Sequence, residues 1–548
     1  MSKLIDFFPK GITPRPQQTK ALNKIEEIWN SGKKIAIGSL PTGIGKSHIA
    51  KAVGESTRDI DPTLQRYIEE YLIYNTKQDG ECTVAQEFLD AESFGSFILT
   101  ITKSLQDQYQ NLFIDGCSMK GKNSYQCEVD DNCSVDFAPC DLAPKQKQRC
   151  FGENCCPYYR ARNAGLIAKS PVLNYSMFLN LPSFLQKRQI LILDEAAEFE
   201  DALVSQYSVT LNYKTLRFSG ILVKPLKDES KGLEWLTEIY KDMVTEYEAA
   251  MADAQISASS GGFGSVSSMV IGKIKRLKDL ISKIDLVMLY WKSCEFMVES
   301  MSSEEVTFAP YNIAPLARSI FQSADKVLMM SATLSDVEEY AKALGLKPEE
   351  YEYFEIASSF DPKKSPIICS KKYSLSYKTM DMVLPKLVEA AIEICEQHGE
   401  ENGIIHTHSF KITQEFKRQI GDNPRYLFRE EGVTNENLMG LHFDAEHPTV
   451  LISPSMSRGV SLDDEMGRFQ IVCKAPFLPL GSKRIARMFK SNSKKYLMKM
   501  LDTTIQMCGR CTRSIEDHSI TYIIDGTLVS AILRSSKTLP KHFIDRFV

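Results

Sequence analysis

A loop after the first apolar run of the chain carries the clearest chemical signal. Residues 41–47 read Pro-Thr-Gly-Ile-Gly-Lys-Ser, between an apolar run at residues 34–40 and a helix-like stretch. Glycines let backbone N–H groups close around phosphate oxygens, and a helix N-terminus adds the positive end of its dipole. Lys46 can reach the β- and γ-phosphates, and the Ser47 hydroxyl can bind Mg²⁺. The spacing therefore predicts a nucleotide-binding loop.

An acidic pair, Asp194 and Glu195, follows the apolar run at residues 189–193. A carboxylate at a strand end can hold Mg²⁺, and its neighbour can orient the water that attacks a phosphate. Acidic pairs are more often solvated surface groups. The position of this pair, after an apolar strand and downstream of a phosphate loop, favours phosphate hydrolysis.

A basic segment near the C-terminus reads Gln-Met-Cys-Gly-Arg-Cys-Thr-Arg at residues 506–513. The planar guanidinium of arginine donates hydrogen bonds in pairs, which suits a phosphate in transfer. We expect a helix here, on which Arg510 and Arg513 would share one face because they are three residues apart. The alternative is a solvated basic helix.

Half of the cysteines lie in a short stretch. The chain has 14 cysteines, and seven of them fall between residues 117 and 156. In a large chain without a signal peptide, such density favours metal binding over disulfides. No pair of C-x2-C knuckles is present, which argues against a common zinc ribbon and leaves iron–sulphur ligation, another zinc site or free thiols. The seven candidates are Cys117, Cys127, Cys133, Cys140, Cys150, Cys155 and Cys156.

Composition sets the frame for these motifs. The 548 residues are 43% hydrophobic and 25% charged, with a net charge of −4. These values are typical of a globular protein of three to four domains. Because the chain as a whole is slightly acidic, any basic surface that binds nucleic acid must be local. No apolar stretch is long enough for a membrane span, and the first residues lack the apolar core of a signal peptide. We therefore expect a cytoplasmic protein that is not secreted.

The elements that must position the motifs are parallel sheets. Near-continuous apolar runs alternate with helix-like stretches, a pattern typical of strands buried on both faces. We expect an α/β fold of two domains that meet at residues 358–364. The predicted strands lie at residues 34–40, 96–101, 189–193, 326–330, 403–406, 448–453, 469–473 and 519–524.

Three segments interrupt this rhythm. Residues 57–94 form a polar, aromatic insertion with no assignment, and residues 110–165 hold the cysteines. Residues 206–311 look helical, because 232–254 and 269–300 carry helical apolar spacing. The Ser- and Gly-rich residues 255–268 between them predict a mobile loop.

Taken in order, these motifs resemble the XPD/DinG family of superfamily 2 iron–sulphur DNA helicases, over nearly the whole chain. Arg15 and Gln18 resemble the adenine-side motif, Ser331-Ala-Thr-Leu334 resembles motif III, and Asn174-Tyr175 follows the cysteine segment as in the family. The other matching segments are residues 41–47 (motif I), 102–106 (Ia), 120–127 and 156–159 (borders of the cysteine segment), 194–196 (II), 459–460 (V) and 506–513 (VI).

The resemblance implies two RecA-like motor domains, with an iron–sulphur domain and a helical arch domain inserted in the first. ATP and Mg²⁺ would bind between the motors, where Gln506, Arg510 and Arg513 would complete the site of Lys46, Asp194 and Glu195. The loop residues Thr42, Gly43, Gly45 and Ser47 would bind nucleotide together with Arg15 and Gln18. Single-stranded DNA would pass over both motors in the 5′ to 3′ direction, and a monomeric motor would unwind forked or tailed duplex.

The same resemblance implies a [4Fe–4S] cluster held by Cys127, Cys140, Cys150 and Cys156, with Cys133 and Cys155 as alternatives. The implied boundaries are residues 1–109, 166–205 and 312–360 for the first motor, with an insertion at 57–94. The iron–sulphur domain would span residues 110–165, the arch 206–311, and the second motor 361–548.

Four positions depart from the family pattern. Ala197 replaces the histidine that ends motif II and couples it to motif III, and Leu40 replaces a small residue in motif I. Arg458 and Ser461 replace two acidic residues of motif V. These changes keep open a second hypothesis, a DNA-binding ATPase or scaffold with a poorly coupled motor. A third is a zinc-binding P-loop protein unrelated to DNA.

Overall fold

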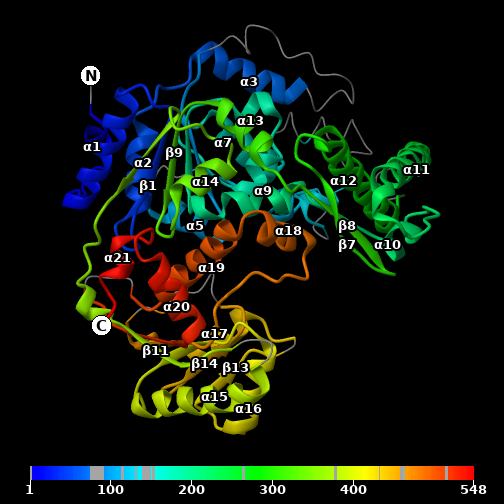
Figure 1. The fold of residues 1–548 in the computed structure, drawn as a ribbon. Coiled ribbons are helices and arrows are strands. Elements are labelled where there is room, and N and C mark those ends of the chain that lie inside the picture. The colour runs from blue at the N-terminus through cyan, green and yellow to red at the C-terminus, as the bar shows by residue number, and fades with distance from the viewer. Residues whose placement is uncertain are drawn as a thin grey trace.

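Two parallel sheets organise the chain. The computed structural model describes residues 3–74, 92–112, 117–129, 133–138, 150, 155–261, 266–375, 379–430, 432–456, 462, 464–512 and 516–548. Figure 1 shows the domain of the first sheet above that of the second, with the orange helices α18 (Lys483–Ser491) and α19 (Ser493–Cys508) between them. The chain passes from one sheet to the other between Glu355 and Ile367, at the predicted seam.

The first sheet has seven strands, all parallel. Successive side chains of each strand face opposite sides, so Leu193 packs in one apolar cluster and Ile192 in the other, which also holds residues of the first two helices. Both faces are thus buried, as the apolar runs predict. In spatial order the strands are β10 (Tyr351–Glu355), β1 (Ile35–Ser39), β9 (Ala324–Ser331), β5 (Arg188–Asp194), β2 (Ser96–Thr100), β4 (Val172–Asn174) and β3 (Ser118–Met119).

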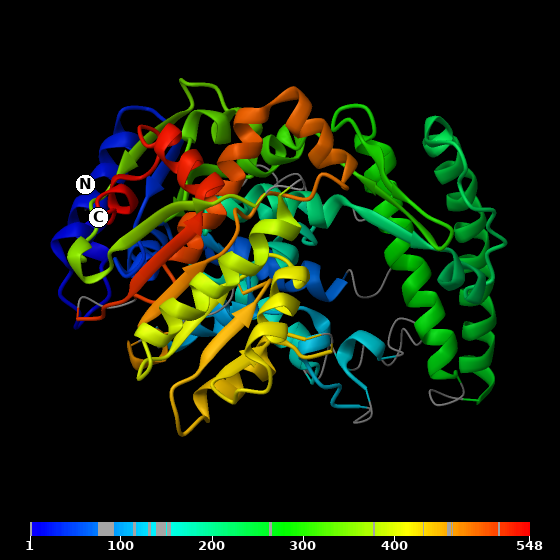
Figure 2. The same cartoon turned by 60° about the horizontal axis from the view of Figure 1, so that its bottom comes forward.

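The second sheet has six strands, again all parallel. Figure 2 brings this domain to the front and shows its helices against the sheet. The four strands predicted after residue 400 are confirmed, and β11 and β13 were not predicted. In spatial order the strands are β11 (Ile367–Tyr373), β16 (Ile520–Asp525), β15 (Phe469–Val472), β12 (Gly403–His406), β14 (Val450–Ser453) and β13 (Tyr426–Phe428).

Helices connect the strands of each sheet. Those of the first domain are α1 (Pro16–Asn30), α2 (Lys46–Glu55), α3 (Pro62–Tyr74), α5 (Lys103–Leu112), α7 (Pro157–Ile167), α8 (Tyr175–Leu179), α9 (Phe199–Tyr207), α13 (Ala314–Gln322) and α14 (Val337–Ala343). Those of the second, besides α18 and α19, are α15 (Met380–Gln397), α16 (Phe410–Ile420), α17 (Asn435–Phe443), α20 (Gly526–Ser535) and α21 (Lys541–Ile544). None of the helices in these described ranges is long and apolar enough to cross a bilayer.

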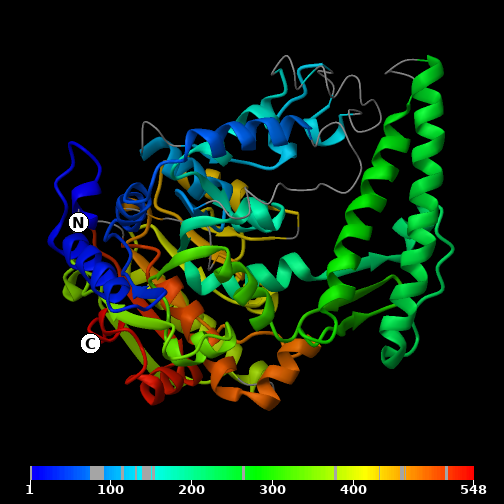
Figure 3. The same cartoon turned by 90° about the horizontal axis from the view of Figure 1, so that it is seen from above.

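A helical arm projects from the first domain. Helices α11 (Gly232–Gly261) and α12 (Ser268–Tyr290) lie side by side, which Figure 3 shows in green at the edge of the molecule. The short α10 (Tyr213–Phe218) and a three-stranded antiparallel sheet of β6 (Val209–Asn212), β8 (Glu305–Ala309) and β7 (Met297–Met301) form its base.

Two expectations for this arm were wrong. The predicted loop at residues 255–268 is helical as far as Gly261, because α11 continues through the serines; residues 262–265 lie outside the described residues. The predicted helix at residues 269–300 ends at Tyr290; a turn follows as far as Glu295, which has a positive φ of 48°, and the chain then pairs as β7 with β8.

The cysteine segment is described only in part. Its β3 adds the outermost strand to the first sheet by pairing with β4, and its 3-10 helix η3 (Val135–Phe137) reaches the arm, where Asp136 forms an ion pair with Lys275 of α12. The Lys275 ammonium also lies 4.1 Å from the centre of the Phe137 ring. Of the unassigned insertion at residues 57–94, α3 is described and contacts α7, whereas residues 75–91 lie outside the described residues.

Candidate active site

The predicted phosphate loop joins β1 to α2. Gly43 and Gly45 have φ angles of 80° and 86°, in the region that side chains other than glycine rarely adopt. A Cβ atom on Gly43 would lie 2.1 Å from the Phe360 ring, and one on Gly45 would lie 2.4 Å from Gln18 Nε2. Both glycines are therefore required by backbone conformation and by space. Phe360, in the segment between the two sheets, is a lining residue that the sequence motifs did not indicate.

The loop lysine meets the acidic pair. Lys46 is the first residue of α2, and its Nζ lies 2.7 Å from Oε1 of Glu195. Asp194 is the last residue of β5, and Glu195 turns the chain with a φ of 52° into the 3-10 helix η6 (Ala196–Glu198). The carboxyl ends of parallel strands share one edge of the sheet, so residues 149 positions apart come into contact.

Two tyrosines hold Asp194. The Tyr109 hydroxyl donates to Asp194 Oδ2 at 2.9 Å, and the Tyr175 hydroxyl donates to the Asp194 backbone oxygen at 2.9 Å. Burial raises the pKa of Asp194 to about 6, although Lys46 acts in the opposite direction. Sequence reasoning noted Tyr175 only as part of a motif and missed Tyr109, which lies on α5 three residues after Gln106.

Arg15 and Gln18 contact the loop from α1. Arg15 Nη1 donates to the carbonyl of Gly43 at 2.8 Å, and Gln18 Nε2 donates to that of Ile44 at 3.0 Å. The two residues also bond to each other, from the Arg15 backbone N–H to Gln18 Oε1 at 2.8 Å. The predicted adenine-side residues thus lie directly against the phosphate loop.

A cleft of about 1430 Å³ opens between the two domains. Its lining includes loop residues 41–43 and 45–47, the pair Asp194 and Glu195, and Gln506 and Arg510 of the second domain. The domains approach closely here, because a Cβ atom on Gly509 would lie 3.7 Å from Thr42 Oγ1. The structure therefore gathers the described catalytic candidates from both domains around one space.

The basic segment differs from its predicted form. Helix α19 ends at Cys508, so Gln506 is helical whereas Arg510 lies in the following turn, where its N–H donates to the carbonyl of Met507. The shared helix face predicted for the two arginines is therefore wrong, since Gly509 ends the helix. Arg513 lies outside the described residues, as do Arg458, Gly459, Val460 and Ser461 of motif V.

Ala197 faces a small cavity of about 50 Å³ between the domains. The lining includes Thr333 of motif III, and Asp502 and Gln506 of α19. Beside Ala197, Glu198 Oε1 accepts a hydrogen bond from Gln506 Nε2 at 3.2 Å. A polar contact between the motif II segment and α19 thus lies one residue beyond the departure from the family pattern.

Two of the predicted cluster ligands, Cys127 and Cys150, act electrostatically on a third, Cys156. Burial raises the pKa of the Cys156 thiol, and the nearby thiols of Cys150 and Cys127 raise it further. Cys155, by contrast, directs its Sγ to the carbonyl of Cys150 at 3.4 Å. Cys140 lies outside the described residues, and among those that are described no three His, Cys, Asp or Glu side chains are gathered as metal ligands.

Comparison with known proteins agrees with this arrangement. Two family models match: DEAD_2 over residues 99–216, and a helicase C-terminal domain over residues 391–543. The first covers the acidic pair, and the second covers Gln506 and Arg510. No curated protein matches the chain in sequence.

Solved structures share the fold over almost the whole chain. An XPD helicase superposes with a TM-score of 0.61 at 16% identity, covering 98% of this chain and all of its own. An apo XPD gives a TM-score of 0.51 at 14% identity, covering 95% of this chain and 98% of its own. Xpd4 of S. tokodaii gives 0.53 at 12% identity with the same coverage. The two helicase domains, the pair of RecA-like sheets and the cleft between them identify this chain as an XPD/DinG-like helicase that hydrolyses ATP.

Proposed function

We propose that the chain is an ATP-dependent DNA helicase that moves along single-stranded DNA and separates duplex DNA. The observation that carries the proposal is the cleft between the motors, where Lys46, Glu195 and Arg510 line one space. A site divided between two bodies can convert nucleotide binding into relative motion. The motif resemblance supports DNA as the track, 5′ to 3′ as the direction, and forked or tailed duplex as the substrate.

In this proposal Lys46 and Glu195 act on the two sides of the terminal phosphate. Their side chains lie 2.7 Å apart, so a phosphate beside Lys46 competes with Glu195 for the ammonium group. Glu195 is then available to orient the attacking water. Thr42, Gly43 and Gly45 form the loop around the phosphates, while Arg15 and Gln18 bind the adenine side.

Ser47 and Asp194 are the groups that we assign to Mg²⁺, which neutralises phosphate charge when bound. Their surroundings fit a cation. Asp194 is 4% exposed and burial raises its pKa to about 6, so its ionised form gains from a nearby positive charge. From the second motor, Arg510, Arg513 and Gln506 would reach the terminal phosphate when the motors close.

We further propose a [4Fe–4S] cluster on Cys127, Cys140, Cys150 and Cys156. The effect of the Cys150 and Cys127 thiols on the pKa of Cys156 supports this set, and the contact of Cys155 with a carbonyl favours Cys156 over it. A cluster would fix a segment that lacks a large apolar core. Cys156→Ser should lose iron and strand separation but keep ATP hydrolysis; Cys133→Ser and Cys155→Ser are the controls, and full iron content in Cys156→Ser would exclude that ligand.

We infer the domain limits from the motifs: residues 1–109, 166–205 and 312–360 for the first motor, 110–165 for the cluster domain, 206–311 for the arch and 361–548 for the second motor. We also propose that the helicase works as a monomer, associated with nucleic acid in the cytoplasm. Light scattering of the protein on tailed duplex would test the stoichiometry.

The decisive experiment is strand displacement with ATP on duplexes that carry a 5′ or a 3′ single-stranded tail, using protein purified without oxygen. Displacement of the 5′-tailed duplex alone is expected. Lys46→Ala should abolish both displacement and hydrolysis, because the phosphates lose their cation. Equal displacement of both substrates would contradict the direction, and none with either would contradict unwinding.

A second function, a DNA-stimulated ATPase that couples poorly to unwinding, is favoured by Ala197. A methyl group cannot form the hydrogen bonds of the histidine that the family has here. If coupling is loose for this reason, Ala197→His should increase the base pairs opened per ATP hydrolysed. An unchanged ratio would mean that other residues perform the coupling.

A further inference from the structure

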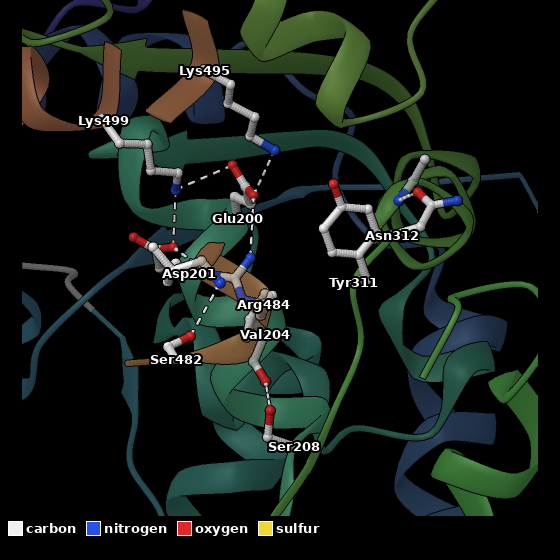
Figure 4. A network of polar contacts seen from close by, with 12 residues as sticks. Glu200, Asp201, Val204, Ser208, Tyr311, Asn312, Ser482, Arg484, Lys495 and Lys499 are labelled. Carbon is white, nitrogen blue, oxygen red and sulfur yellow. Dashed lines mark hydrogen bonds and ion pairs between the residues drawn. The ribbon is translucent and has the colours of Figure 1, made fainter. Parts of the chain in front are cut away.

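A network of ion pairs joins the two motors beside the nucleotide cleft. On α9, Glu200 lies 2.8 Å from Lys495 and 3.1 Å from Lys499, and Asp201 lies 2.9 Å from Lys499. Arg484 of α18 approaches the two carboxylates at 3.8 and 3.9 Å. Figure 4 shows Glu200 between Lys495, Lys499 and Arg484, with Asp201 also facing Lys499. We name Glu200, Asp201, Arg484, Lys495 and Lys499 the inter-motor network.

The centre of the network is buried. Glu200 is 3% exposed, and burial alone would raise its pKa, but Lys499, Lys495 and Arg484 outweigh this effect and lower it to about 2. Burial likewise acts against the charge of Lys499, yet Asp201 and Glu200 raise its pKa. Removing one member of a buried ion pair leaves an uncompensated charge, so both sides of the network depend on the contact between the motors.

The network lies on a short path between catalytic groups. Glu200 follows Glu195 by five residues, with only η6 between them. Helix α19, which carries Lys495 and Lys499, ends two residues before Arg510. Further contacts fix the helix along its length: Lys494 with Asp336 at 2.8 Å, and Asp502, which accepts from the Ser335 N–H at 2.9 Å.

Helix α18 is held by the arch as well. Glu299 of β7 accepts hydrogen bonds from the Arg484 N–H at 2.8 Å and from the Ser482 hydroxyl, at the N-terminus of α18. A carboxylate at this end of a helix is stabilised by the helix dipole. The pair α18–α19 is thus fixed by the first motor and the arch, although it belongs to the second motor.

We propose that Glu200 and Asp201, through Lys495 and Lys499, are positioning residues that set α19 relative to the motif II carboxylates. In this role they link the nucleotide site to the second motor at the place where Ala197 lacks the polar side chain of the family histidine. The inference rests on the proposed helicase function. In this proposal, the inter-motor network holds Gln506 and Arg510 in position during hydrolysis.

The test compares charge-removing and charge-keeping substitutions. Glu200→Gln should lower the kcat of DNA-stimulated ATP hydrolysis roughly tenfold or more, with KM for ATP within about twofold of native, because the phosphate loop is untouched. Asp201→Asn and Lys499→Gln should each lower kcat, and the double variant should lose less than the product of the two single losses. Lys499→Arg should retain most of the activity.

A matched control and a second measurement separate positioning from folding. Lys417 of α16 pairs with Glu430 inside the second motor, so Lys417→Gln should keep native kcat. Hydrogen exchange should be faster in α18 and α19 of Glu200→Gln, without change in α15 and α16. If Glu200→Gln misfolds, Asp201→Asn serves instead, since Asp201 is about one-third exposed.

Three outcomes would overturn the inference. Native kcat in Glu200→Gln, or unchanged exchange in α18 and α19, would exclude a positioning role while the native chain remains an active ATPase. Equal loss in Lys499→Arg and Lys499→Gln would assign the residue to packing alone. Absence of ATP hydrolysis in the native chain is a distinct result, because it would overturn the proposed function itself.

Discussion

Two acidic pairs lie on one short segment of the chain and have opposite electrostatic surroundings. Asp194 ends β5 and is followed by Glu195, whereas Glu200 and Asp201 lie in the first turn of α9. Asp194 is buried near Lys46 and has a pKa raised to about 6, whereas Glu200 is equally buried but faces three cations and has a pKa lowered to about 2.

The difference teaches that burial alone does not determine what a carboxylate can do. Burial raises the pKa of Asp194 by more than the nearby Lys46 ammonium lowers it. The ionised carboxylate would therefore be stabilised by a further cation, which suits a ligand site. The cations around Glu200 lower its pKa by more than burial raises it, so its negative charge is already compensated. The first pair is suited to bind and react, and the second to hold two domains together.

The largest expected effect is on ATP hydrolysis and comes from the first acidic pair, Asp194 and Glu195. Glu195→Gln should lower ATP hydrolysis by about 10²–10⁴-fold, because the attacking water loses its orienting base. Binding of ATP, measured by fluorescence with a nucleotide analogue, should persist since Lys46 remains. A loss comparable to that of Glu200→Gln, roughly tenfold, would remove the functional distinction between the two pairs.

The next effect is on stability and comes from removing the lysines that compensate the charge of Glu200. Lys495→Met combined with Lys499→Met leaves Glu200 with only Arg484 nearby, so the free energy of unfolding should fall by about 3–5 kcal/mol. Urea unfolding followed by circular dichroism gives the value. Lys417→Met, on the exposed face of α16, is the control and should stay within ~1 kcal/mol of native. Equal stability of all three proteins would mean that the network is not a structural contact.

The pH dependence of stability tests whether the charge of Glu200 stabilises the fold. The pKa of Glu200 is lowered from 4.5 to about 2, so its stabilisation is present above pH 4.5 and is lost as the pH falls toward 2. Native protein should therefore exceed Glu200→Gln in unfolding free energy by ~3 kcal/mol at pH 7. Urea unfolding between pH 7 and 3 should show this difference shrinking only below pH 4.5. A constant difference would show that the charge of Glu200 is not its source.

The smallest effect concerns the partner of Asp194. Tyr109→Phe removes the hydroxyl that donates to Asp194 at 2.9 Å and leaves the ring in place. The loss of one hydrogen bond to a carboxylate should weaken hydrolysis by roughly 10-fold, with a rise in the Mg²⁺ concentration for half-maximal rate. The ATPase rate at varied Mg²⁺ measures both. Tyr158→Phe, at a ring outside the cleft, is the control.

Much of this architecture was predictable from local patterns. The apolar runs predicted both sheets because parallel strands are buried on both faces, and the phosphate loop was predicted from glycines that its backbone requires. The strands β3, β4 and β13 were missed because each has only two or three residues, too few for a periodic signal. The longer β10 and β11 were also missed, because most of their side chains are not buried and they form no continuous apolar run. The helix predicted for residues 506–513 is helical only as far as Cys508, and Arg510 was placed on it because the spacing of two arginines does not reveal where a helix ends.

The amino-acid sequence by itself determined the chemistry that is available: a phosphate loop, an acidic pair after a strand, a distal arginine and a concentration of thiols. Only the tertiary structure decided how these groups are used. Lys46 meets Glu195, Tyr109 bonds to Asp194, and Glu200 is buried among cations of another domain. The physical reason is that burial and Coulomb interaction depend on distances in space. A local motif specifies the groups it contains, but not the charges that folding brings from hundreds of residues away.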